Sequence, residues 1–185
     1  QVYLDFFSKT FADYKKQKNL ETKDFDAIIY HLPFTKMGLK ANRIAVADQD
    51  EATTEKLQNS FAASKQLSRR VGNIYTASLY MSLLSLLENG NLSAGSLVGL
   101  FSYGSGAMGE FYSGNLVAGY EKEINAASDE KMLERRQKLS IPEYEDVFNT
   151  ALEDPEDNEE LTSDDEKGTW YFAGTKGNIR QYKVK

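Results

Sequence analysis

The spacing of hydrophobic and polar positions along the chain predicts alternating helices and strands. An amphipathic helix is expected over residues 1–14, continuing into the polar stretch 15–19, because apolar side chains recur there at helical spacing. A second helix is expected over 51–71, closed by Gly72. Residues 74–88 are apolar nearly all round a helical wheel, with serines that allow close approach, so this helix is expected inside the structure with layers on more than one side.

Short β-rich runs lie between and after these helices. Residues 26–31 form one such run, which ends at Leu32-Pro33, where a helix cannot easily continue. His31 is therefore expected at a strand end, a place where α/β proteins often carry reactive groups. Residues 96–103 and 107–117 read as a hairpin around Gly104-Ser-Gly106, and residues 170–184 read as a strand pair around a turn at 174–177.

Composition excludes some classes of chemistry. The 185 residues include no cysteine, which rules out disulfides and thiolate metal sites, so covalent thioester chemistry would need sulfur from another segment. The first residues do not have the pattern of a secretory signal, and the apolar stretch 74–87 is too short to span a bilayer. A soluble, cytoplasmic protein without a membrane contact is expected.

Charge is distributed unevenly along the chain. Residues 143–166 hold 12 of the 28 acidic residues and no Lys or Arg, which leaves 22 basic and 16 acidic residues elsewhere. A mildly basic body favours an anionic ligand. The basic residues are scattered rather than clustered, so nucleic acid is not expected as a partner. The acidic segment is expected to be a solvated helix or loop.

The only histidine, His31, is the first candidate for catalysis, since imidazole titrates near neutrality. Lys36 and Lys40 follow it and would share one face if the chain becomes helical after Pro33. Cations beside an acid–base group suit an anionic substrate. The plainer interpretation is that both lysines belong to a solvated face.

Two further motifs have both a chemical and a structural interpretation. Gly104-Ser-Gly-Ala-Met-Gly109 matches a dinucleotide fingerprint, but a true fingerprint opens a helix and this one continues in β-rich sequence, so the match is taken as accidental. Its glycines would instead let a ligand approach closely around Ser105. The sequence shows no neighbouring base that would activate Ser105 as a nucleophile. Asn73 either caps the following helix or supplies an amide donor to a carbonyl oxygen under attack.

Three segments occur in order along the chain: His31-Leu-Pro-Phe-Thr-Lys-Met-Gly, Gly72-Asn-Ile-Tyr-Thr-Ala-Ser and Phe101-Ser-Tyr-Gly-Ser-Gly-Ala-Met-Gly-Glu-Phe-Tyr-Ser-Gly. Together they resemble the signature segments of bacterial 3-hydroxy-3-methylglutaryl-CoA synthases. The resemblance extends from the first helix to the aromatic tail and is weakest through the acidic segment. It implies an α/β, thiolase-like layered fold, with a mixed sheet packed against helices and a buried central helix, of which this chain is the carboxyl-terminal half.

The resemblance also implies a reaction and roles for particular residues. Enzymes of this family condense acetyl-CoA with acetoacetyl-CoA in the mevalonate pathway of isoprenoid biosynthesis, with no cofactor beyond these substrates and no metal. His31 would be the general acid or hydrogen-bond donor to the ketone oxygen. Asn73 and Ser105 would position the acetoacetyl group, and Lys36 and Lys40 would approach the phosphates and pantetheine arm of coenzyme A.

The chain departs from the family in one respect. The nucleophilic cysteine and the glutamate base of these enzymes lie in their amino-terminal half, and nothing in this sequence replaces them. The chain alone is therefore expected to be inactive. Its expected partners are coenzyme A thioesters and that amino-terminal half, and the full-length enzyme is expected to be a homodimer.

Three alternatives remain open from the sequence. A ketoacyl carrier-protein synthase shares the histidine and the Gly72-Asn73 segment but lacks the features at Pro33-Phe34 and 103–113. A related enzyme that performs the same chemistry on carrier-protein thioesters for β-branching is harder to separate. A non-catalytic module that works through the acidic segment 143–166 is the rival of another class. One domain over 1–185 is expected in each case.

Overall fold

The computed structural model describes residues 1–149 and 169–184. Contacts group the chain into two compact units, Gln1–Arg135 and Arg136–Lys185. That the whole chain forms one domain stays a prediction. Of the acidic segment 143–166, only residues 143–149 lie within the described residues.

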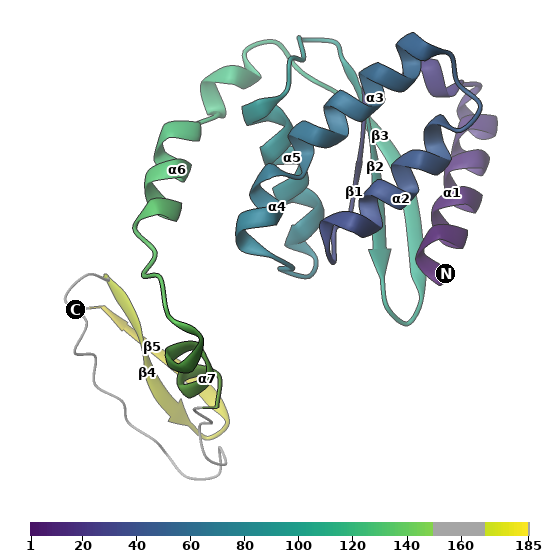
Figure 1. Ribbon diagram of the computed structural model, residues 1–185. Helices are drawn as coiled ribbons and strands as arrows, with labels where there is room; N and C mark the ends of the chain where they lie inside the picture. The colour runs from purple at the N-terminus through teal and green to yellow at the C-terminus, as the bar shows by residue number, and fades with distance from the viewer. Residues whose placement is uncertain (150–168, 185) are drawn as a thin grey trace. The chain divides into compact units, whose positions relative to one another are not determined.

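The first unit consists of helices around a small sheet (Figure 1). Its elements in chain order are α1 (Val2–Lys18), η1 (Thr22–Asp24), β1 (Ala27–Tyr30), α2 (Thr35–Val46), α3 (Glu51–Ser64), α4 (Gln66–Val71), α5 (Ala77–Asn89), β2 (Leu97–Gly104), β3 (Met108–Asn115), η2 (Tyr120–Glu123) and α6 (Ala126–Glu134).

The sheet of this unit is mixed, with strand order β1-β2-β3. β1 pairs with β2 in parallel, and β2 and β3 form the predicted antiparallel hairpin. Alternate residues of β1 face opposite layers: Ile28 and Tyr30 join the core with α1, α2 and α3, whereas Ala27 and Ile29 join the core with α5. Burial on both faces explains why β1 is a continuous apolar run.

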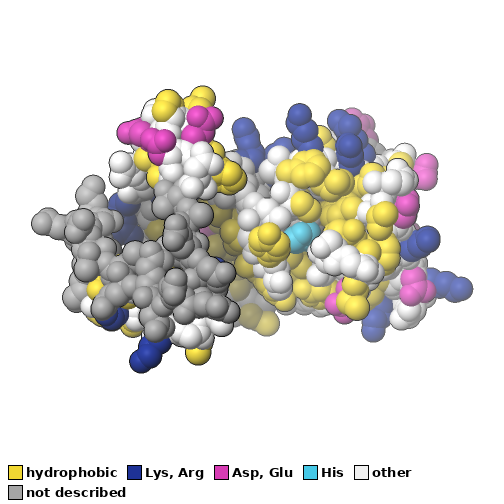
Figure 2. Space-filling model, turned by 90° about the horizontal axis from the view of Figure 1, so that it is seen from below, with side chains coloured by type: hydrophobic (Ala, Val, Ile, Leu, Met, Phe, Trp, Pro, Cys, Tyr) yellow, Lys and Arg dark blue, Asp and Glu magenta, His cyan; other side chains and the backbone are white. Residues whose placement is uncertain are grey.

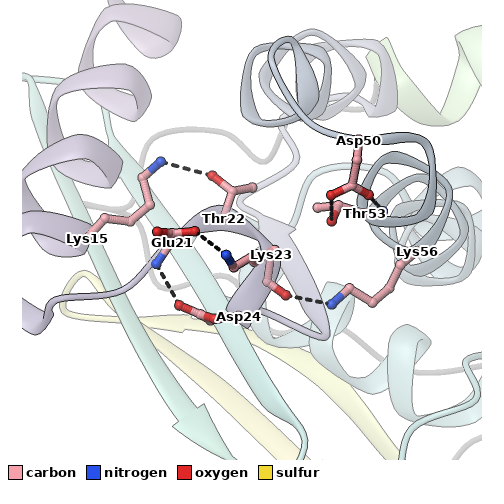
Figure 3. Close-up of polar contacts among 8 residues, drawn as sticks. All are labelled: Lys15, Glu21, Thr22, Lys23, Asp24, Asp50, Thr53 and Lys56. Atoms are coloured by element: carbon pink, nitrogen blue, oxygen red, sulfur yellow. Dashed lines mark hydrogen bonds and ion pairs between the residues drawn. The ribbon is translucent and has the colours of Figure 1, made fainter.

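A polar turn fixes the entry into β1 (Figure 3). Within it the backbone N–H of Glu21 donates to Asp24 at 2.7 Å, and Lys15 of α1 donates to the Thr22 hydroxyl at 2.9 Å. Lys56 of α3 donates to the carbonyl oxygen of Lys23 at 2.8 Å. These contacts connect α1 and α3 to the residues that lead into the sheet.

The predicted helix over 51–71 is interrupted, because α3 ends at Ser64 and α4 begins at Gln66. Ser85 of α5 lies at the break: its hydroxyl accepts from the backbone N–H of Leu67 at 3.2 Å and donates to the carbonyl oxygen of Ala63 at 2.7 Å. In a continuous helix the N–H of Leu67 would donate a hydrogen bond to the carbonyl oxygen of Ala63, four residues earlier. The Ser85 hydroxyl is therefore inserted between the two groups of one backbone hydrogen bond, and such an insertion interrupts a helix.

The predicted buried helix is α5, which packs against β1 and β2 and against α3 and α4. Ser78, Ser82 and Ser85 are fully buried, which confirms that its serines allow close approach. Helix α5 starts at Ala77 rather than at Ile74, and Tyr80 is exposed.

The second unit contains α7 (Ile141–Asn149) and an antiparallel pair, β4 (Trp170–Lys176) and β5 (Ile179–Val184). The strand pair confirms the prediction for the tail. The turn is shorter and lies later than the expected 174–177: Gly174 lies at an irregularity of β4, and the chain reverses at Gly177 and Asn178, both with positive φ. Such a pair of left-handed residues matches the twist of the flanking strands.

Candidate active site

His31 is held by its backbone at the end of β1. Its N–H donates to the carbonyl oxygen of Phe101 on β2 at 2.8 Å, which extends the parallel pairing by one residue. Its own carbonyl oxygen accepts a hydrogen bond from the Tyr3 hydroxyl of α1 at 2.8 Å. The predicted position of His31 at a strand end is confirmed.

The His31 side chain is buried, with a relative exposure of 9%. Burial lowers the pKa of the imidazole below its usual 6.5, because desolvation disfavours the cation. Burial therefore favours the neutral form of His31 at pH 7. A neutral imidazole carries one N–H donor and one acceptor nitrogen.

Asn73 lies in the loop before α5 and organises it. Its Oδ1 accepts from the Tyr75 backbone N–H and from the Ser78 hydroxyl, both at 2.9 Å. The Ser78 hydroxyl in turn accepts from the N–H of Ile74 at 2.9 Å. Asn73 is not the helix cap considered from the sequence, since Thr76 is the residue at that position. Because Oδ1 is used by the loop, the amide NH₂ is the group left for a ligand.

One cavity brings three of the five predicted site residues together. It has a volume of about 500 Å³, and its wall includes His31, Asn73 and Ser105. Ser105 is exposed in the turn between β2 and β3. The strand end, the α5 loop and the hairpin thus meet at one place although they are far apart in the sequence. Figure 2 shows the visible part of the histidine surrounded by hydrophobic side chains.

Lys36 and Lys40 are placed differently. The chain does become helical after Pro33, as α2, so the two lysines share a face, and both are exposed. Neither belongs to the wall of the His31 cavity. Their predicted contact with coenzyme A remains a prediction.

The cavity wall contains further residues to which the sequence assigned no role in the site. They are Pro33, Tyr75, Thr76, Ser102, Tyr103, Gly104, Met108 and Glu110. Glu110 is the only acidic side chain among the residues of this wall. Strand alternation from Met108 could have indicated that Glu110 shares the face of the hairpin tip. Which layer that face meets could not be read from the sequence.

The described residues, 1–149 and 169–184, contain neither a metal centre nor a membrane span. Within these ranges no group of three or more His, Cys, Asp or Glu side chains could hold a metal ion. In the same ranges no helix has the length and apolar character needed to cross a membrane.

The layers and the cavity together define a class of protein. A solved structure of HMG_CoA synthase complexed with CoA superposes with a TM-score of 0.88 at 39% identity, covering 99% of this chain and 47% of that one. The protein smu.943c from Streptococcus mutans UA159 superposes with a TM-score of 0.86 at 37% identity, covering 99% of this chain and 49% of its own. The fold is the predicted thiolase-like α/β fold.

The chain belongs to the hydroxymethylglutaryl-CoA synthase family. The family model described as hydroxymethylglutaryl-coenzyme A synthase C terminal matches residues 41–185. The hydroxymethylglutaryl-CoA synthase of Enterococcus faecalis is 40% identical over 184 residues, which cover 99% of this chain and 47% of that protein. The polyketide biosynthesis 3-hydroxy-3-methylglutaryl-ACP synthase PksG of Bacillus subtilis is 34% identical over 152 residues, 79% of this chain and 36% of that protein. The chain spans about half the length of the curated relatives it matches, and it corresponds to their carboxyl-terminal half.

Proposed function

We propose that this chain supplies the carboxyl-terminal half of a hydroxymethylglutaryl-CoA synthase, an acyltransferase that condenses acetyl-CoA with acetoacetyl-CoA. The observation that carries the proposal is the convergence of His31, Asn73 and Ser105 on one cavity from three separate elements. An imidazole, an amide and a hydroxyl are the kinds of donor that bind a ketone oxygen as it gains negative charge. Membership of the family supports the same assignment.

The state of His31 specifies its proposed role. Because burial lowers its pKa, the neutral imidazole is favoured, and this form offers an N–H hydrogen bond rather than a cationic charge. When the acetyl carbanion equivalent adds to the ketone of acetoacetyl-CoA, the carbonyl π electrons move to oxygen. His31 donates a hydrogen bond to that oxygen as its negative charge develops, and the oxygen then takes a proton from water and ends as the tertiary hydroxyl. The Asn73 amide is the second proposed donor.

Coenzyme A is proposed to approach along α2. This helix has no acidic residue in its first turn and carries Lys36 there, so the partial positive charge of its amino end is not compensated by the helix itself. Lys40 adds a second exposed cation one turn further on. An anionic phosphate would be stabilised by both lysines. The solved relative with bound CoA supports this class of ligand.

The remaining parts of the reaction are proposed to come from outside this chain. With no cysteine here, the acetylated nucleophile is proposed to belong to an amino-terminal half. We further propose that the complete enzyme is a cytoplasmic homodimer of the mevalonate pathway, and that it needs no cofactor besides its thioester substrates.

The test is to supply the missing half. The chain alone should show no release of CoA from acetyl-CoA and acetoacetyl-CoA, and the chain joined to an amino-terminal half of the family should show it. The His31→Ala variant of the joined protein should lose at least about 100-fold in kcat. A control variant, Lys9→Ala, removes an exposed side chain of α1 outside the cavity and should keep the activity. Restored activity that is indifferent to His31 would contradict the proposal.

Carrier-protein thioesters are the second candidate substrates, because a relative named as an HMG-ACP synthase is 34% identical over 152 residues. The same joined protein can be assayed with acetoacetyl-CoA and with acetoacetyl carrier protein. Preference for the CoA substrate, with a raised KM in the Lys36→Ala/Lys40→Ala double variant, is expected. Preference for the carrier-protein substrate would instead assign the chain to an enzyme that performs β-branching on carrier-protein thioesters.

A further inference from the structure

Tyr3 of α1 has a hydroxyl that is directed at the active-site segment. The side chain is 4% exposed, and its hydroxyl donates to the carbonyl oxygen of His31 at 2.8 Å, across 28 positions of sequence. Burial raises the pKa of this hydroxyl well above its usual value, so it remains a donor across the working pH range.

The hydrogen bond completes the fixation of the His31 backbone. The N–H of His31 is already bound to Phe101 at 2.8 Å, so both polar backbone groups of the residue have a partner. Leu32 then leads into Pro33, whose ring restricts the backbone that precedes it. The imidazole is left with only its own two side-chain torsions to set its direction.

The ring of Tyr3 also supports the cavity wall. It packs edge-on against Phe101 and against Tyr103, in each case with ring centroids 5.2 Å apart. Phe101 is the residue that accepts from His31, and Tyr103 lines the cavity. One side chain of α1 thus contacts the β2 residue that binds the His31 backbone and a residue of the cavity wall.

We propose that Tyr3 is a positioning residue for His31, which orients the imidazole through the backbone of the strand end. The inference rests on the proposed function for its catalytic consequence, but not for its structural part. A reacting group displaced by a fraction of an ångström loses much of its effect on rate, whereas substrate binding depends on other contacts. Loss of the Tyr3 hydroxyl therefore acts on kcat rather than on KM.

The kinetic test compares two variants of the joined enzyme. Tyr3→Phe removes only the hydroxyl and keeps the aromatic packing. Tyr14→Phe is the matched control, since Tyr14 lies on the same helix and its hydroxyl makes an equally short 2.8 Å hydrogen bond, to Ser113 of β3. We expect Tyr3→Phe to lower kcat by about fivefold to tenfold with KM unchanged, and Tyr14→Phe to leave both unchanged. An equal fall in both variants would overturn the proposal.

A spectroscopic test uses the chain by itself. Because His31 is the only histidine, its imidazole NMR signals need no assignment. We expect those signals and their titration midpoint to shift in Tyr3→Phe and to stay in place in Tyr14→Phe. Signals unchanged in Tyr3→Phe would refute the positioning role. If His31→Ala leaves the joined enzyme active while the Tyr3→Phe signals shift, the proposed function has failed and the structural inference has not.

Discussion

At the scale of single residues, the chemistry of the site follows from how each polar group is satisfied. His31 has both backbone groups bonded and its side chain buried, so its imidazole is presented in one place and in its neutral form. Asn73 uses its oxygen on the loop that carries it and keeps its amide protons available. The two side chains line the same cavity, and each carries an N–H group.

The His31 pKa gives a direct prediction. Because burial lowers it, the imidazole of the folded chain should titrate below pH 6.5, and NMR titration of its ring signals measures the midpoint. The unfolded chain binds the proton first as the pH falls, so this residue's contribution to the free energy of unfolding is present above pH 6.5 and is lost as the pH falls through the folded-state value. A midpoint above 6.5 would contradict the burial argument.

A second residue-scale prediction separates the two functions of Asn73. The Asn73→Asp substitution keeps the acceptor for Tyr75 and Ser78 but removes the amide donor and adds a negative charge. We expect a melting temperature close to that of the parent chain and a fall in kcat/KM of about tenfold or more in the joined enzyme. Asn73→Ala, which removes both functions, should in addition destabilise by about 1 kcal/mol. Unchanged kinetics in Asn73→Asp would exclude the donor role.

At the scale of helices and strands, small residues decide how closely the elements approach. Ser85 of α5 enters the backbone of α3 and α4, and Gly38 lets α2 lie against the residues beside His31. A Cβ at Gly38 would lie 2.3 Å from Leu32 and 2.9 Å from Phe61. Gly38 is therefore needed for packing and not for an unusual backbone conformation.

This contact predicts the outcome of Gly38→Ala. In an exposed helix the substitution would stabilise by roughly 1 kcal/mol, but here the added methyl group must displace Leu32 or Phe61, so we expect destabilisation of about 1 to 3 kcal/mol. Chemical denaturation measures it. Gly114→Ala is the control, because nothing lies within 4 Å of a Cβ there, and it should change stability by less than about 1 kcal/mol. A stabilised Gly38→Ala variant would show that the site is open.

At the scale of the whole molecule, the described residues contain a carboxyl group that makes stability depend on pH. Glu88 of α5 lies beside Asp129 and Glu130 of α6. Burial is the main cause that raises its pKa to about 7, followed by the hydrogen bond with Asp129 and the negative charges of both neighbours. The folded chain therefore holds a proton that the unfolded chain releases near pH 4.5.

The sign of this effect can be tested. The contribution of Glu88 is fully present below about pH 4.5 and is lost as the pH rises through about 7, so the free energy of unfolding should fall over this window. Glu88→Gln should reduce that slope and stabilise the chain at pH 8. Glu55→Gln, on the exposed surface of α3, is the control for the loss of one negative charge. Equal pH profiles for Glu88→Gln and the parent chain would contradict the shifted pKa.

Much of the fold could be predicted because its signals are local. The helical spacing of Tyr3, Phe7 and Phe11 describes α1, and the glycines at 104–106 mark the hairpin between β2 and β3. The prediction that His31 lies at a strand end is confirmed, because Pro33 ends the β-rich run that forms β1. The order of the three signature segments along the chain predicted the family, and the family model that matches residues 41–185 confirms this prediction.

The sequence by itself therefore determined the family and the position of most helices and strands, since turn chemistry and hydrophobic period depend on neighbours a few positions away. Only the tertiary structure decided which groups meet. Ser85 interrupts the predicted helix 51–71, and Asn73 binds its own loop instead of capping α5. Lys36 and Lys40 lie outside the cavity wall, and the Tyr3 hydroxyl binds the carbonyl oxygen of His31. Each of these outcomes depends on a contact between segments far apart in the chain, and no local pattern encodes such a contact.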